Sequence, residues 1–188
     1  FTQGNTPVVW RGPMLHRALQ QFLADVYWGD LDVLLLDLPP GTGDVAISVA
    51  QLLPGAEILV VTTPQSAAAE VAERAGAIAL QTRQRLVGVV ENMAGLLMPD
   101  GTVMQVFGEG GGRQVAERLS RTVGAEVPLL GQVPLDPALV TAGDSGVPLV
   151  LSAPDSAAGR ELRGIADKLA SRRRGLAGMS LGLDPAGR

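Results

Sequence analysis

One stretch of the sequence decides the expected fold: Val33-Leu34-Leu35-Leu36-Asp37-Leu38-Pro39-Pro40-Gly41-Thr42-Gly43-Asp44. Its four consecutive apolar residues, ended by turn-forming residues, predict a strand over 33–36 that is buried on both faces within a parallel sheet. We therefore expect Asp37 at the carboxyl end of a central strand. Open α/β sheets bind their ligands at this end.

The loop after this run contains residue types that suit a phosphate and a metal ion. Gly41 and Gly43 allow backbone N–H groups to approach an anion closely, because glycine has no Cβ. Asp37 is placed to hold Mg²⁺, directly or through water. The alternative is a turn followed by a helix, with Asp44 as its N-cap. The combination favours the metal and γ-phosphate side of a nucleotide site, with Asp37 and Asp44 as candidate catalytic carboxylates.

The composition narrows the possible functions. The 188 residues fit one domain, and 46% apolar with 18% charged residues is typical of a globular chain. A net charge of −4 argues against nucleic acid as a partner. No apolar run approaches the ~20 residues that span a bilayer, so no membrane association is expected. The absence of cysteine excludes disulfides and thiolate metal sites within this chain and fits a cytoplasmic location.

Apolar periodicity predicts alternating strands and helices. Besides 33–36, strands are expected over 58–63, over 86–92 and within 127–134. Helices are expected over about 13–28, 44–53, 66–84, 113–122, 137–143 and 155–173. Strands separated by helix-length segments indicate right-handed βαβ units in a parallel sheet. We assign 1–173 to one domain and expect the glycine-rich tail 174–188 to be disordered.

The segments between these elements are less regular. Residues 98–101 carry a turn signal, and 102–107 could form a short strand or one arm of a hairpin. The glycine cluster 108–112 could bind phosphate, but it lacks the Gly-Lys-Ser/Thr ending of a P-loop, so a packing turn or hinge is favoured. The two prolines at 148 and 154 predict an extended stretch between them.

Six segments, in order along the chain, carry a resemblance to a known family. They are Trp10-Arg11-Gly12-Pro13-Met14, Asp37–Asp44, Thr62-Thr63-Pro64-Gln65, Glu91-Asn92-Met93, Phe107-Gly108-Glu109-Gly110-Gly111 and Leu130-Gly131-Gln132-Val133-Pro134-Leu135-Asp136. From about Val9 to Ala170 the chain resembles the Mrp/ApbC family of P-loop ATPases, iron–sulfur cluster carriers related to MinD and the nitrogenase iron protein. The resemblance implies an α/β fold, a P-loop NTPase-like parallel sheet flanked by helices. It also implies that 1–173 are an incomplete Mrp-type nucleotide-binding domain, whose first strand and P-loop would lie upstream of Phe1.

The resemblance also implies roles for individual residues. Asp37 would be the Walker B carboxylate that holds Mg²⁺ through water, and the loop Gly41-Thr42-Gly43 would sense the γ-phosphate of ATP. Asn92 would hydrogen-bond the adenine edge, since its amide both donates and accepts. The other side of the base pocket would be formed by Pro134, Leu135 and Asp136. The family is homodimeric and delivers clusters to apo iron–sulfur client proteins.

Two departures from the family pattern matter for function. Without a P-loop, we expect these 188 residues alone neither to bind ATP tightly nor to hydrolyse it. The family's Cys-x-x-Cys pair follows the Glu-Asn-Met segment, where this chain has Leu97-Met98-Pro99-Asp100-Gly101. An iron–sulfur cluster is thus expected from the family, without cysteine ligands in this chain. The alternatives are a MinD-like, nucleotide-switched interaction protein and an inactive fragment.

Overall fold

The computed structural model describes residues 12–39, 44–65 and 68–171. The strands are β1 (Ile58–Thr62), β2 (Leu86–Leu97), β3 (Val103–Met104) and β4 (Leu129–Leu135). The helices are α1 (Gly12–Ala24), α2 (Asp44–Leu52), α3 (Ala68–Thr82), α4 (Gly111–Val123), α5 (Pro137–Ser145), α6 (Leu149–Ser152) and α7 (Ala157–Ala170). Within the described residues, no helix is both long and apolar enough to cross a bilayer.

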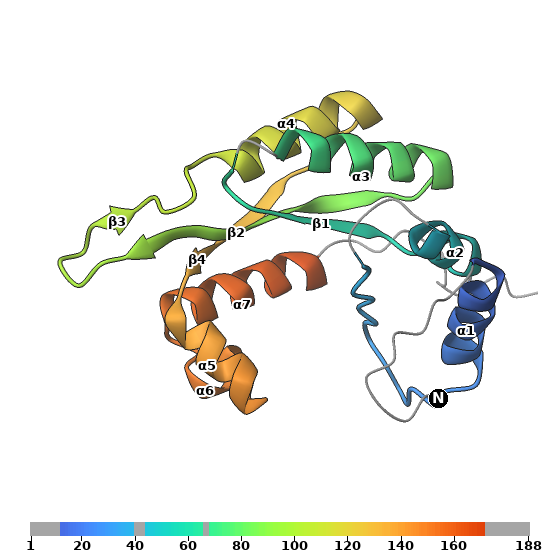
Figure 1. Cartoon of the computed structure of the whole chain (residues 1–188), viewed down its shortest axis with the longest axis horizontal. Coiled ribbons are helices and arrows are strands. Elements are labelled where there is room, and N and C mark those ends of the chain that lie inside the picture. The colour runs from blue at the N-terminus through green and yellow to red at the C-terminus, as the bar shows by residue number, and fades with distance from the viewer. Residues whose placement is uncertain (1–11, 40–43, 66–67, 172–188) are drawn as a thin grey trace, which may run out of the picture.

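The strand β2 is the centre of the sheet. It pairs in parallel with β1 on one edge and with β4 on the other, as the alternation of strands and helices predicts. Its last part also pairs antiparallel with β3, where Leu96 lies opposite both Met104 of β3 and Leu135 of β4. The sheet is therefore mixed, and the expected hairpin arm at 102–107 is confirmed. In Figure 1 this β2–β3 hairpin projects from the body of the sheet.

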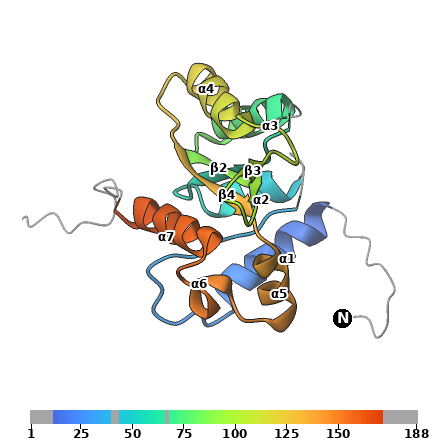
Figure 2. The same cartoon turned by 90° about the vertical axis from the view of Figure 1, so that its left-hand side faces the viewer.

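Helices cover both faces of the sheet because successive side chains of its strands point to opposite sides. Val89 of β2 is buried with Leu119 under α3 and α4. Val90, the next residue, is buried on the other face with Leu130 and Ile165, under α5, α6 and α7. Figure 2 shows this arrangement, with α3 and α4 on one side of the strands and α7 on the other.

The predicted buried strand over 33–36 is wrong in this structure. Residues 33–39 form no strand, and the side chain of Leu35 is 78% exposed and that of Val33 59% exposed. A strand is buried on both faces only when neighbouring strands pair with it and bring helices over it. Among the described residues, β1 pairs only with β2, and no strand pairs with 33–36.

Two further segments differ from the secondary structure that the sequence predicts. The stretch between the two prolines is not extended but contains the short helix α6, which Pro148 precedes as its N-cap. Proline fits a helix start because its fixed φ and missing N–H cost nothing there. The strand β2 extends five residues beyond the predicted end at Asn92, since its last part pairs with β3. The predicted tail 174–188 lies outside the described residues.

Candidate functional site

An irregularity within β2 and the carboxyl end of β4 bring together the residues expected to hold the base. Asn92 lies opposite Val133 in the parallel register, which puts it beside Pro134 and Leu135 at the end of β4. Asp136 follows directly and caps α5, because its carboxylate accepts a hydrogen bond from the N–H of Ala138 at 2.9 Å. The four residues predicted to form the base site, Asn92, Pro134, Leu135 and Asp136, therefore lie side by side. They define one edge of the sheet, the one toward which its parallel strands run.

The backbone leaves regular strand geometry immediately after Asn92. The register with β4 shifts between Asn92 and Leu96, and Met93 adopts a φ of 60°, which is uncommon for a residue with a side chain. The Oδ1 atom of Asn92 accepts a hydrogen bond from the N–H of Met93 at 2.9 Å. Bulges of this kind often lie beside binding sites, where they redirect a side chain.

The glycine cluster packs the start of α4 against this same edge. A Cβ atom on Gly111 would lie 2.5 Å from the carbonyl oxygen of Thr63, and one on Gly112 would lie 2.7 Å from the Cβ of Glu91. Both contacts are closer than real Cβ atoms tolerate, so only glycine allows the helix to come this near. Of the two predicted roles for 108–112, the structure supports a packing turn.

Glu91 and Gln132 are polar residues of this edge for which the sequence patterns predict no role. The Glu91 side chain is 1% exposed and accepts hydrogen bonds from Gly112 N at 2.5 Å and from Gln132 Nε2 at 2.7 Å. The amino end of α4 adds a favourable positive dipole. The N–H of Gln132 donates to Glu161 of α7 at 2.8 Å. The sequence does contain a signal for the contact between Glu91 and Gly112. Glu91 follows an apolar run, and two glycines, Gly111 and Gly112, stand where a helix begins.

Within the described residues, the structure does not bring those expected on the phosphate and metal side together into one site. Asp37 lies on the exposed stretch before the loop and not at a strand end. Asp44 begins α2, while Gly41, Thr42 and Gly43 lie outside the described residues. No group of three or more His, Asp or Glu side chains suited to a metal occurs among the described residues. Mg²⁺ in nucleotide sites needs only one or two carboxylates besides phosphate and water, so a single Asp37 fits that ion.

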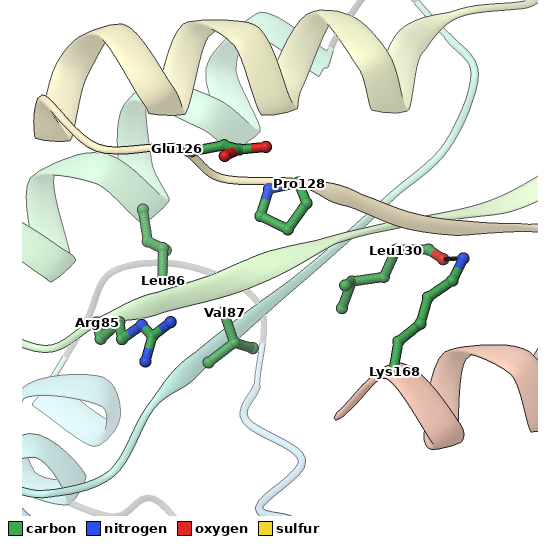
Figure 3. Close-up of a pocket in the computed structure, with 7 residues that line it drawn as sticks. All are labelled: Arg85, Leu86, Val87, Glu126, Pro128, Leu130 and Lys168. Carbon is green, nitrogen blue, oxygen red and sulfur yellow. Dashed lines mark hydrogen bonds between the residues drawn. The ribbon is translucent and has the colours of Figure 1, made fainter. Parts of the chain in front are cut away.

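A pocket of about 300 Å³ lies at the opposite, amino ends of β2 and β4 (Figure 3). Its lining includes Arg85, Val87, Glu126 and Lys168, and the Nζ of Lys168 donates to the carbonyl oxygen of Leu130 at 2.5 Å. Because it lies at the other ends of the strands, this pocket is separate from the predicted base site.

The tip of the β2–β3 hairpin contains a perturbed carboxyl group. The hydroxyl of Thr102 donates to Asp100 at 2.6 Å and its N–H donates to the same oxygen at 2.9 Å. Both bonds favour the ionised form, the hydroxyl more strongly, and lower the pKa of Asp100 below its ordinary value. The backbone of Met98 pairs with Thr102 at 2.8 Å, which confirms the predicted turn.

Comparison with known sequences confirms the family that the six sequence segments predict. The family model described as ParA, NUBPL iron-transfer P-loop NTPase, matches residues 1–170. The iron-sulfur cluster carrier protein of Mycobacterium tuberculosis is 87% identical over 188 residues, which is 100% of this chain and 49% of that protein. The protein of the same name from Saccharolobus solfataricus is 46% identical over 88% of this chain and 54% of its own length. The chain thus spans about half the length of these curated relatives.

Solved structures show the same fold. A nucleotide-binding protein from Archaeoglobus fulgidus in complex with ADP is 37% identical, with a TM-score of 0.59 over 71% of this chain and 53% of that one. The septum site-determining protein MinD from Pyrococcus horikoshii, complexed with Mg-ADP, is 21% identical with a TM-score of 0.59 over 89% of this chain and 58% of that one. The latter likeness shows the fold alone. With the family match over 1–170, these findings show that the chain belongs to the NUBPL iron-transfer family of P-loop NTPases.

Proposed function

We propose that this chain forms the base-binding part of an ATP-dependent iron–sulfur cluster carrier or assembly factor. By parent protein we mean this chain extended to the length of its curated relatives. The observation that carries the proposal is the position of Asn92, at the irregularity of β2, beside 134–136 at the carboxyl end of the parallel strand β4. Ligands of open α/β sheets bind at this end, and the relatives' name and the ADP-bound neighbour support the choice of ligand and cargo.

The base would lie between β2 and the start of α5. The Oδ1 atom of Asn92 already accepts the Met93 N–H, so its NH₂ group is the part that donates to a ring nitrogen. Leu135 and Pro134 supply apolar surface for the flat ring, and both are half-buried. Asp136 fixes the start of α5 by its cap and thereby the path of this side of the pocket.

On the phosphate side, Asp37 would hold Mg²⁺ through water, while Gly41 and Gly43 would donate backbone N–H groups to the γ-phosphate. Bound Mg²⁺ would neutralise phosphate charge during hydrolysis. The exposure of Asp37 allows a water-mediated ligand. We propose Asp44 as the second catalytic carboxylate of this loop.

The cluster is the cargo of this function, and the donor set of this chain does not fit it. The 188 residues contain no cysteine, and aspartate or methionine are poor substitutes for thiolates. In our proposal the thiolates come from outside these residues. The parent protein would be a cytoplasmic homodimer that serves apo iron–sulfur proteins.

The test uses the parent protein reconstituted anaerobically with iron and sulfide. A cluster that absorbs visible light and passes to an apo-protein is the expected result, and failure of both would overturn the carrier role. Asp37→Ala should abolish most ATP hydrolysis and leave the free energy of unfolding nearly unchanged, because the side chain is exposed. An equal loss of both would instead indicate a structural role for Asp37.

A second candidate is a nucleotide-switched interaction protein without cluster chemistry. It is favoured by the β2–β3 hairpin, which projects from the sheet and exposes Leu97, Val103 and Met104 by half or more. Nucleotide-dependent capture of a protein partner, with no cluster formed, would select it.

A third candidate is that the 188 residues by themselves have no nucleotide function. Calorimetry of this chain with Mg-ATP tests it. We expect no tight binding, and micromolar affinity would contradict our view that the P-loop is indispensable.

A further inference from the structure

Glu91 is a buried charged residue that the proposed function does not use. Its side chain is 1% exposed and is among the largest fully buried side chains of the described residues. A carboxylate is tolerated in such a place only when its oxygens are hydrogen-bonded. Apolar residues of similar shape in place of Glu91 and Gln132 would stabilise the sheet about as well. Stability alone therefore does not explain a carboxylate at this position.

The two donors to Glu91 come from two different elements. Oε2 accepts the N–H of Gly112 at the start of α4, and Oε1 accepts Nε2 of Gln132 on β4. Glu91 lies on β2 between them. One carboxylate therefore fixes a helix and a neighbouring strand to the strand that carries Asn92.

The contact continues to the other face of the sheet through Gln132. Its N–H donates to Glu161 Oε1 on α7 at 2.8 Å. A Cβ on the preceding Gly131 would lie 2.5 Å from the same Glu161 oxygen, so α7 is packed directly onto the strand here. Gln132 is thus held from both sides, by α7 through its backbone and by Glu91 through its side chain.

The register places this pair next to the base site. Glu91 lies opposite Gln132, and the following pair is Asn92 opposite Val133, directly before Pro134. A displacement of β4 against β2 at Glu91 would move both walls of the base site apart.

We propose that Glu91 is a positioning residue for the nucleotide base: by holding Gln132 and the start of α4, it sets the distance between Asn92 and 134–136. This inference rests on the proposed nucleotide function. It assigns to Glu91 a part in the choice of adenine over guanine, since that choice depends on where the Asn92 amide meets the ring.

A polarity swap tests the proposal in the parent protein. Gln132→Glu sets two carboxylates together, whereas Glu91→Gln keeps both hydrogen bonds once the Gln132 amide turns over, because an amide has both an acceptor oxygen and an NH₂ donor. The double variant E91Q/Q132E restores one donor and one acceptor, and the amide oxygen introduced at position 91 can still accept the Gly112 N–H. Val127→Ala, at a buried position just before β4, is the control for a stability loss away from this edge.

The measured quantities are the dissociation constants of ATP and GTP and the free energy of unfolding. We expect Gln132→Glu to lose about tenfold in preference for ATP over GTP, the size of a misplaced charge-assisted hydrogen bond, and the double variant to regain it. Glu91→Gln should keep most of the preference, because its amide can still make both bonds. Val127→Ala should lose stability and keep the preference.

Several results would overturn the inference. They are an unchanged preference in a folded Gln132→Glu variant, a double variant that regains stability without regaining preference, or a double variant that does not fold. If the Gln132→Glu variant does not fold, a folded double variant with wild-type preference supports the inference. A wild-type parent protein that binds neither nucleotide would refute the proposed function, and the inference with it. A wild-type protein that binds ATP, together with a folded Gln132→Glu variant that keeps its preference, would refute the inference about Glu91 alone.

Discussion

Replacing Gly112 by alanine tests the packing of α4 on the sheet edge most directly. The added Cβ would lie 2.7 Å from the Cβ of Glu91, 3.0 Å from its Oε2 and 3.1 Å from Cδ1 of Leu129. Glu91 is fully buried and cannot swing into solvent. The substitution must therefore push α4 outward or displace Glu91, and either movement lengthens the 2.5 Å hydrogen bond from Gly112.

Three contributions set the expected magnitude. Overpacking a well-packed site costs about 1–3 kcal/mol. Weakening a hydrogen bond to a charged group costs up to about 1.5–3 kcal/mol. Alanine returns up to about 1 kcal/mol because it is the better helix former. The net loss in the free energy of unfolding is therefore about 1.5–5 kcal/mol.

Urea unfolding of the 188-residue chain, followed by circular dichroism, measures this loss. Gly164→Ala is the matched control, because Gly164 lies within α7 and its Cβ would meet nothing within 4 Å. We expect the control to gain up to about 1 kcal/mol. If Gly112→Ala gained as much as the control, the close contact between α4 and Glu91 would be refuted.

Three further predictions concern the core, a helix cap and the hairpin tip. Leu119→Ala, at a side chain with 0% exposure, should cost about 3 kcal/mol in urea unfolding, whereas Leu80→Ala, at 55% exposure, should stay within about 0.5 kcal/mol; equal losses would contradict the core assignment. Asp136→Ala should cost about 1 kcal/mol by loss of the α5 cap, and Asp136→Ser should restore most of it; a silent alanine variant would argue against the cap. Thr102→Ala should raise the pKa of Asp100 toward its ordinary value in an NMR titration, since the Thr102 hydroxyl is the largest of the hydrogen-bond contributions that lower it. Because a lowered pKa stabilises the folded state above the unfolded-state pKa, this contribution is present at neutral pH and is lost as the pH falls through the folded-state pKa; an unchanged titration in the variant would contradict the hydroxyl bond.

Much of the fold could be predicted because the information is local. The strands β1 and β2, the latter as far as Asn92, follow from apolar runs ended by polar or turn residues, and the helices from 3.6-residue periodicity. The turn at 98–101 follows from its Pro-Asp-Gly sequence. The common edge of Asn92 and 134–136 also follows, because parallel strands end on the same side of a sheet. These features depend on short-range patterns and on one topological rule.

The linear pattern of residues was thus enough to predict the family and the alternation of strands and helices, both of which are confirmed. It also predicts where a nucleotide would bind, and that stays a prediction. Two points depended on packing in three dimensions. The apolar run 33–36 is exposed because a strand is defined by its paired neighbours, and no described strand pairs with it. Glu91 is buried beside Gln132 and Gly112 because segments 21 and 41 residues away along the chain supply its two donors. Contacts between distant segments depend on how the layers pack, and no local pattern contains them.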